Sequence, residues 1–144
     1  MSDVFISYSR LDIDFVRYLL DQLTAHDREP WADWQDILPT ADWLAEIYTG
    51  IEAADSFLFI ISPDSVASEI CSLEIEHTVK HNKRLIPVAW KDADNVHQVM
   101  LAHNWLFLRE ADDFNANLEL LIDALDTDLD YVRIYWLNPV WWHD

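Results

Sequence analysis

The sequence predicts an α/β domain built on a five-stranded parallel sheet, in the strand order 2-1-3-4-5, with helices on both faces. Short apolar runs alternate along the chain with amphipathic stretches, which is the pattern of repeated strand–helix units. The runs are continuously apolar, as is typical of strands that are covered on both faces. A chain of 144 residues, 51% of them hydrophobic, can bury the core of one domain but hardly of two.

Four strong apolar runs and one weaker run predict the strands. The strong runs are VFISY (residues 4–8), FLFII (57–61), LIPVAW (85–90) and WLFL (105–108), and the weaker run covers residues 30–34. Each is followed by a stretch with polar residues, so the chain is expected to return over the sheet after every strand and to keep the strands parallel.

Two stretches between the strands have the spacing of amphipathic helices. One helical face of residues 11–23 would carry Phe15, Val16, Leu19, Leu20 and Leu23, and one face of residues 43–54 would carry Trp43, Leu44, Ile47 and Ile51. Ser9, followed three residues later by Asp12, predicts a helix N-cap with a supporting acid at the third helical position.

In such a sheet, ligands bind beyond the carboxyl ends of the strands, so the loops after Tyr8, Trp34 and Ile61 are the expected site. Dinucleotide and phosphate-loop motifs need several glycines to let the backbone approach phosphate, and the chain contains only Gly50. A phosphoacceptor domain needs an acidic pair after the first strand and an aspartate after the third. The chain reads SYS and SP at these places, which disfavours that function.

Composition also limits the partners. A formal net charge of −18 without a run of Lys or Arg repels phosphate backbones and anionic lipids, so we expect neither nucleic acid nor a membrane as partner. The N-terminus lacks the pattern of a signal peptide, and no apolar run reaches the roughly 18 residues that span a bilayer. One cysteine excludes an internal disulfide. We expect a cytoplasmic protein.

Several ordered motifs together resemble a TIR (Toll/interleukin-1 receptor) domain of the bacterial type. They are DVFISYSRLD at the start, WADWQDILPTADWLAEIYTGIEAAD in the middle, and then FLFIISPDSVASEICSLEIEH and RLIPVAW. The resemblance covers roughly residues 3–125 and implies a flavodoxin-like fold. We therefore expect a TIR domain over residues 1–130, followed by an aromatic tail at residues 131–144. That tail either packs on the domain, offers a surface to a partner, or links to a further domain.

The resemblance implies one of two functions, because TIR domains either cleave NAD+ or act as scaffolds that bind other TIR domains. The enzymes use a glutamate on the third helix, and this glutamate corresponds to Glu74. The loop through which such domains assemble corresponds to Ile37, Leu38, Pro39 and Thr40. Two positions depart from the family pattern: Ile70 stands where many catalytic members have Trp, and Thr40 stands where the loop usually has Gly.

Cleavage of NAD+ needs little more than one carboxylate. The nicotinamide leaves without protonation because it is a cationic pyridinium, so only the positive charge that builds on the ribose requires stabilisation. Glu74 can supply that charge, with NAD+ as the substrate and without a further cofactor. The substrate-binding residues expected around it are Tyr8, Arg10, Asp33, Asp36 and Ile70, with Arg10 as the cation nearest the pyrophosphate and the two aspartates as acceptors for ribose hydroxyls.

Other interpretations of these residues stay open at the level of the sequence. Glu74 could be a solvated helix charge like Glu76, Arg10 a surface cation, and Asp36 a turn residue. Cys71 fits a buried core position better than a nucleophile, and the tryptophans fit the core better than a stacking platform. Glu74, His77 and His81 share one helical face and have the spacing of metal ligands, but carboxylate-bridged metal sites need that motif twice. No metal site is therefore expected.

Overall fold

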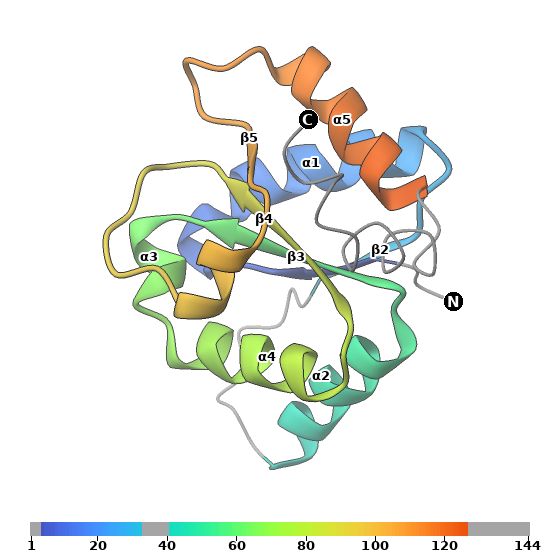
Figure 1. Ribbon diagram of the computed structural model, residues 1–144. Coiled ribbons are helices and arrows are strands. Elements are labelled where there is room, and N and C mark those ends of the chain that lie inside the picture. Colours follow the sequence, from blue (N-terminus) through green and yellow to red (C-terminus); the bar gives the residue numbers. More distant parts are fainter. Residues whose placement is uncertain (1–3, 33–40, 127–144) are drawn as a thin grey trace, which may run out of the picture.

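The computed structural model describes residues 4–32 and 41–126. In these residues a parallel sheet lies between two layers of helices (Figure 1). In chain order the elements are β1 (Val4–Ser7), the 3-10 helix η1 (Arg10–Asp12), α1 (Ile13–Ala25), β2 (Pro30–Trp31), α2 (Ala41–Ala53), β3 (Ser56–Ile61), α3 (Pro63–Val66), α4 (Glu69–Lys80), β4 (Arg84–Ala89), η2 (Gln98–Ala102), β5 (Leu106–Phe107) and α5 (Phe114–Asp126).

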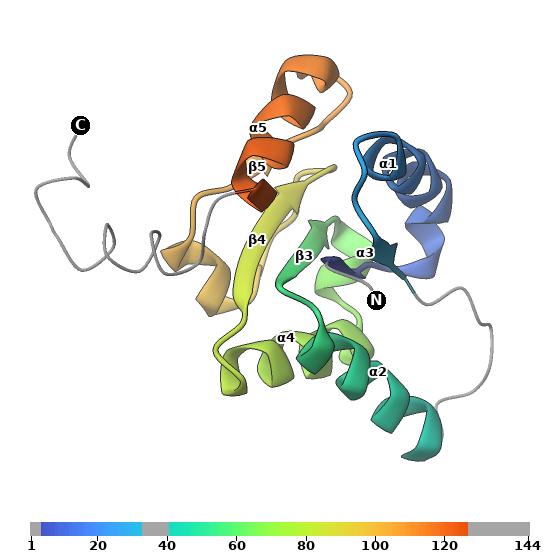
Figure 2. The same ribbon diagram turned by 90° about the vertical axis from the view of Figure 1, so that its right-hand side faces the viewer.

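The sheet has five strands in the order β2-β1-β3-β4-β5, and each neighbouring pair runs parallel. Helices α1 and α5 cover one face, and α2 and α4 cover the other (Figure 2). The predicted strand order and the helices on both faces are thus confirmed. The two outermost strands, β2 and β5, have two residues each and are shorter than their apolar runs suggested.

The strands divide their side chains between two hydrophobic clusters. Alternate residues of a strand point to opposite faces, so Ile6, Leu58 and Val88 pack beneath α1 and α5. Phe5, Phe57 and Ile61 pack on the α2 and α4 side instead. The rings of Phe5 and Phe57 stack there, with centroids 5.6 Å apart and planes 6° apart. This double burial explains why the strand sequences are apolar at every position.

Two helices end in the same left-handed turn without glycine. Asp27, with φ 61°, follows the C-cap of α1, and Asn82, with φ 53°, follows the C-cap of α4. In the second turn the amide of Lys83 donates to the carbonyl of Thr78, and the first has the equivalent bond, which is the Schellman pattern. Asp and Asn tolerate positive φ better than other non-glycine residues, so the chain can make these turns although its one glycine lies inside α2.

Within the part of the chain that the structure describes, no helix is both long enough and apolar enough to cross a bilayer. The predicted aromatic tail at residues 131–144 lies outside the described residues, so the boundary between domain and tail stays a prediction.

Candidate functional site

Glu74 lies in the middle of α4 and turns toward the sheet. Its side chain is only 5% exposed and its carboxylate accepts a 2.9 Å hydrogen bond from the hydroxyl of Ser7. Glu76, two residues further along the helix, is exposed, because two residues advance an α-helix by about 200°. The alternative that Glu74 is a solvated helix charge is therefore wrong.

The helix that carries Glu74 is the second of two helices that follow β3. A short helix, α3, precedes it, and the chain then restarts at Ser68, whose hydroxyl accepts a hydrogen bond from the amide of Cys71 and caps α4. A serine at the N-cap satisfies one of the donors that a helix leaves unpaired at its start. Because of α3, the expected third helix of the chain is α4.

Ser7 is the partner that the sequence analysis missed. It is the last residue of β1 and is 1% exposed. Phe5, two positions earlier, packs on the α2 and α4 side, and strand alternation sends Ser7 to the same side. A hydroxyl inside an apolar run was the available signal, since a buried polar group needs a hydrogen-bond partner.

A second buried polar pair lies at the carboxyl end of the neighbouring strand. Ser62 directly follows β3, and its hydroxyl donates to the carboxylate of Asp12. Ser62 is 0% exposed and Asp12 is 2% exposed. Burial raises the pKa of the Asp12 carboxyl above its usual value, the charge of Asp64 adds to this, and the hydrogen bond from Ser62 and the charge of Lys91 oppose it.

The structure corrects the role that was predicted for Asp12. Ser9 does cap a helix, accepting from the amide of Leu11, but this helix is the 3-10 turn η1. Helix α1 begins only at Ile13, so Asp12 occupies the N-cap position of α1 and makes no side-chain cap bond there. Its carboxylate bonds to Ser62 across the sheet end instead, and the predicted supporting contact with the Ser9 cap is absent among the described residues.

Cys71 lies between these polar groups as a core residue. Its side chain is 1% exposed and packs on the α2 and α4 side of the sheet. Burial raises the pKa of the thiol to about 12, and the charge of Glu74 contributes, against the opposing hydrogen bonds with Ser68 and Ser7. A thiol that stays protonated is a poor nucleophile, as expected for a core position.

Two cations stand at the same end of the sheet. Arg10 is the first residue of η1, three positions after the end of β1. Lys91 follows β4, and its amide donates to the carbonyl of Ile61. The Lys91 ammonium lies 4.3 Å from the centroid of the Trp90 ring, and that ring stacks on Phe15 with centroids 4.8 Å apart. Arg10 was predicted from the sequence. Lys91 was not, because only the pairing of β3 with β4 places it near Asp12.

The remaining predicted site residues fall in different places. Tyr8 is 8% exposed and belongs to the cluster beneath α1 and α5, on the face of the sheet opposite α4. Ile70 lies in the first turn of α4 and packs against the cluster that contains Cys71. The other predicted residues lie outside the described part of the chain, namely Asp33, Asp36, Ile37, Leu38, Pro39 and Thr40.

Three tryptophans that the sequence analysis assigned to the core can be placed. Trp43 is 8% exposed and belongs to the cluster between the sheet and α2 with α4. Trp105 packs against the same cluster, and its indole N–H donates to the carbonyl of Met100. Trp90 packs against the other cluster. Trp43 is therefore a core residue, and Trp90 and Trp105 are partly buried and cover the core.

We predict that Ser7→Ala lowers the free energy of unfolding by about 1–3 kcal/mol, because it removes a donor from a buried carboxylate. Urea denaturation followed by circular dichroism measures the change. Ser72→Ala is the control, since Ser72 lies on α4, the helix of Glu74, with a partly exposed side chain. This substitution should change the stability by less than about 0.5 kcal/mol. If wild type and Ser7→Ala were equally stable, the hydrogen bond between Ser7 and Glu74 would contribute nothing to the free energy of unfolding.

Comparison with known proteins agrees with this fold. The sequence model of the TIR domain matches residues 4–122, which is most of the chain. The chain belongs to the TIR domain family. No curated protein matches it.

Solved TIR structures share the architecture at low sequence identity. The TIR domain of the Toll-related receptor TRR-2 from Hydra magnipapillata has a TM-score of 0.76 at 19% identity, over 88% of this chain and 100% of that one. A TIR-STING receptor from C. gigas, in complex with 2',3'-cGAMP, has a TM-score of 0.71 at 23% identity, over 90% of this chain and 40% of the receptor.

The RPS4 and RRS1 TIR domain heterodimer gives a TM-score of 0.66 at 14% identity, over 87% of this chain and 96% of the matched chain. At such identities the likeness shows the TIR fold alone, since one fold serves many functions.

Proposed function

We propose that this TIR domain cleaves NAD+ at the nicotinamide–ribose bond, with Glu74 as the catalytic carboxylate, and that its activity depends on self-association. The observation that carries the proposal is the Glu74 side chain itself, buried and hydrogen-bonded to Ser7 where β1 ends. Parallel sheets bind ligands at this end, and TIR domains include NAD+-cleaving enzymes.

The chemistry requires a fixed negative charge next to the ribose. When the bond between C1' and the nicotinamide nitrogen breaks, its electron pair leaves with nicotinamide, which becomes neutral. Positive charge then builds on the ribose, and a preorganised carboxylate such as Glu74 stabilises it. Water adds to C1' and gives up a proton, which yields ADP-ribose. In the cyclic product, an adenine nitrogen of the same molecule takes the place of water.

The site also has to attract a dianionic pyrophosphate into a protein with a formal net charge of −18. Arg10 and Lys91 support binding, because both stand at the carboxyl end of the sheet and a local cation offsets the overall field. Asp33 and Asp36 remain proposed ribose contacts because they follow the second strand, and Ile70 remains a proposed substrate contact. Tyr8 stays a proposed contact as well, although it lies on the face of the sheet opposite α4.

A non-catalytic TIR scaffold is the alternative, and one observation favours it. Glu74 is only 5% exposed, so its carboxylate reaches a substrate only if the neighbouring groups rearrange. A purely structural glutamate held by Ser7 would look the same.

One assay separates the two functions. Concentrated protein is incubated with NAD+ and the release of nicotinamide is followed by chromatography. Catalysis predicts release that rises more steeply than in proportion to protein concentration, because activity depends on assembly. Protein that assembles, as seen by sedimentation, yet releases no nicotinamide would establish the scaffold function.

Self-association is proposed to use the segment that contains Leu38 and Pro39. We predict that Leu38→Asp leaves the monomer folded but weakens association, because an unpaired charge in an interface is costly. Sedimentation velocity at increasing concentration measures the effect. Leu101→Asp is the matched control, since Leu101 is 70% exposed in η2. Unchanged sedimentation of Leu38→Asp, or an equal loss in both variants, would contradict the assignment.

A further inference from the structure

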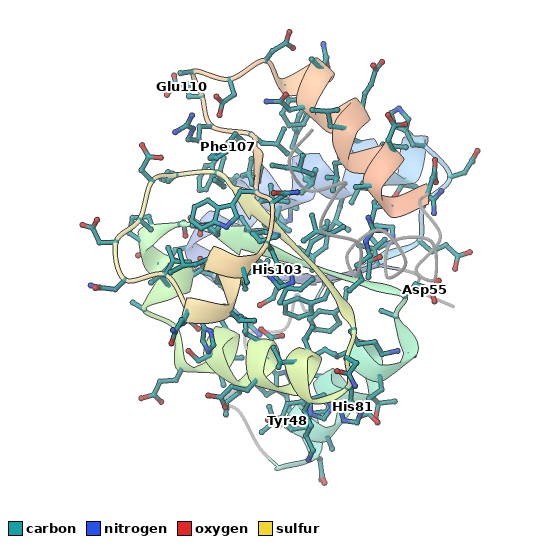
Figure 3. The ribbon with its side chains drawn as sticks, viewed as in Figure 1. Tyr48, Asp55, His81, His103, Phe107 and Glu110 are labelled. Carbon is teal, nitrogen blue, oxygen red and sulfur yellow. The ribbon has the colours of Figure 1, made fainter. Side chains whose placement is uncertain are left out.

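Three potential metal ligands meet where α2 and α4 pack together. Glu52 comes from α2, His77 comes from α4, and His81 is the C-cap residue of α4. One ligand atom from each residue can be chosen so that all three atoms lie within 4.8 Å of one another. Figure 3 shows His81 and the neighbouring Tyr48 at this end of the helix pair. Among the residues that the structure describes, these three are the His, Cys, Asp or Glu side chains that come close enough together to hold a metal ion.

The ring of His77 is held in place from two sides. Its Nε2 atom lies 3.0 Å from a carboxylate oxygen of Glu52. Its face stacks on the ring of Tyr48, with centroids 3.9 Å apart and planes 5° apart. His81 follows four residues later as the C-cap of α4, with its ring centroid 4.3 Å from that of His77. Two histidines at positions i and i+4 of a helix point the same way and can bind one ion.

The ligand set differs from the one that the spacing of the sequence suggests. Glu74 lies one turn before His77, but its carboxylate faces Ser7 at the end of β1. Glu52, which is 25 positions away from His77 in the chain, takes its place beside the histidines. The carboxylate of the group therefore comes from a neighbouring helix, which a search for local motifs does not find.

We propose that Glu52, His77 and His81 form a binding site for a divalent transition-metal ion of the Zn²⁺ type. Imidazole nitrogen and carboxylate oxygen are ligands that Zn²⁺ takes, and three protein ligands with water as the fourth complete a tetrahedral shell. The ligand atoms of such a shell lie about 3.4 Å apart. Binding would therefore require the side chains of Glu52 and His81, both exposed, to rotate until their ligand atoms reach this spacing.

Burial and charge also favour the ion. The His77 side chain is 12% exposed and that of Glu52 is 47% exposed, so the ion would sit at the surface and be reached from solvent without opening the core. The formal net charge of −18 favours cations near the surface. A bound ion would tie α2 to α4, the helix that carries Glu74. This role is separate from NAD+ cleavage and does not depend on it.

The test uses the whole chain, freed of metal by chelation, and Zn²⁺ alone as the probe. Isothermal titration calorimetry measures the stoichiometry and affinity for wild type, His77→Gln, His81→Gln and Glu52→Gln. His26→Gln is the matched control, since His26 is an exposed histidine at the end of α1. Circular dichroism verifies that each variant folds, and the visible spectrum of bound Co²⁺ reports tetrahedral coordination.

Wild type and His26→Gln should each bind one equivalent of Zn²⁺. Loss of groups that only orient a ligand already weakens metal sites about 10–100-fold, so losing His77 or His81 itself should cost at least about 10-fold in affinity. The proposal is overturned if wild type shows no saturable binding at one equivalent. It is equally overturned if folded His77→Gln and His81→Gln bind Zn²⁺ as tightly as wild type, because the ion would then lie elsewhere.

Discussion

Nicotinamide release by Glu74→Gln should be lower than that of wild type by on the order of 100-fold or more, while the fold is retained. Glutamine keeps the shape of the side chain and still offers Ser7 an acceptor, but it lacks the negative charge that stabilises the cationic ribose. The measurement compares initial rates at matched protein concentration and matched assembly state. Circular dichroism and the melting temperature verify that both proteins are folded.

The control for this variant is Glu76→Gln, which changes the net charge by the same amount on the same helix. Glu76 is exposed, so its replacement should leave the rate close to that of wild type. If wild type is active and Glu74→Gln keeps most of that activity, Glu74 is not the catalytic group. If Glu76→Gln loses as much activity as Glu74→Gln, the effect comes from overall charge or assembly instead.

Leu58→Ala should lower the free energy of unfolding by about 2–5 kcal/mol, the range seen when a buried leucine is truncated and a cavity stays behind. Leu58 is 0% exposed on β3 and is aligned with Ile6 of β1 and Ile86 of β4. Neighbours on both sides limit how far the site can collapse around the smaller side chain. Urea denaturation monitored by circular dichroism gives the free energy of unfolding.

The same substitution at an exposed leucine provides the comparison. Leu120 lies on α5 and is 53% exposed, so Leu120→Ala should change the free energy of unfolding by no more than about 0.5 kcal/mol. Similar losses in the two variants would mean that the centre of the sheet does not dominate the stability of the domain.

The architecture could be predicted because its signals are local. Each strong strand needs apolar side chains on both faces, so a continuous run such as the one that became β3 shows where a strand lies. The handedness and shortness of the connections then leave few possible strand orders. The lengths of β2 and β5 could not be predicted, since pairing with a single neighbour, and not the apolar run, decides where an edge strand ends.

Only part of the candidate site could be predicted from the sequence. Glu74 was identified through the resemblance of the residues around it, and Arg10 through its place after the first strand. Ser7 was missed because a serine in an apolar run does not show what it will bond to. Asp12 was assigned to a local cap, in which its carboxylate would accept from the backbone amide of Ser9. In the structure the carboxylate accepts from the hydroxyl of Ser62 instead, a residue 50 positions away that lies buried beside it.

By itself, the sequence determined the order of strands and helices, the apolar faces and the family to which the chain belongs, all of which depend on residues close together in the chain. Only the tertiary structure decided which polar groups meet. Ser7 and Glu74 are 67 positions apart, Asp12 and Ser62 are 50 apart, and Glu52 and His77 are 25 apart. Parallel strands return to the same edge of a sheet only after a crossover of many residues, so the polar groups at that edge come from separate segments. Glu52 and His77 also come from separate segments, and the packing of α2 against α4 brings them together.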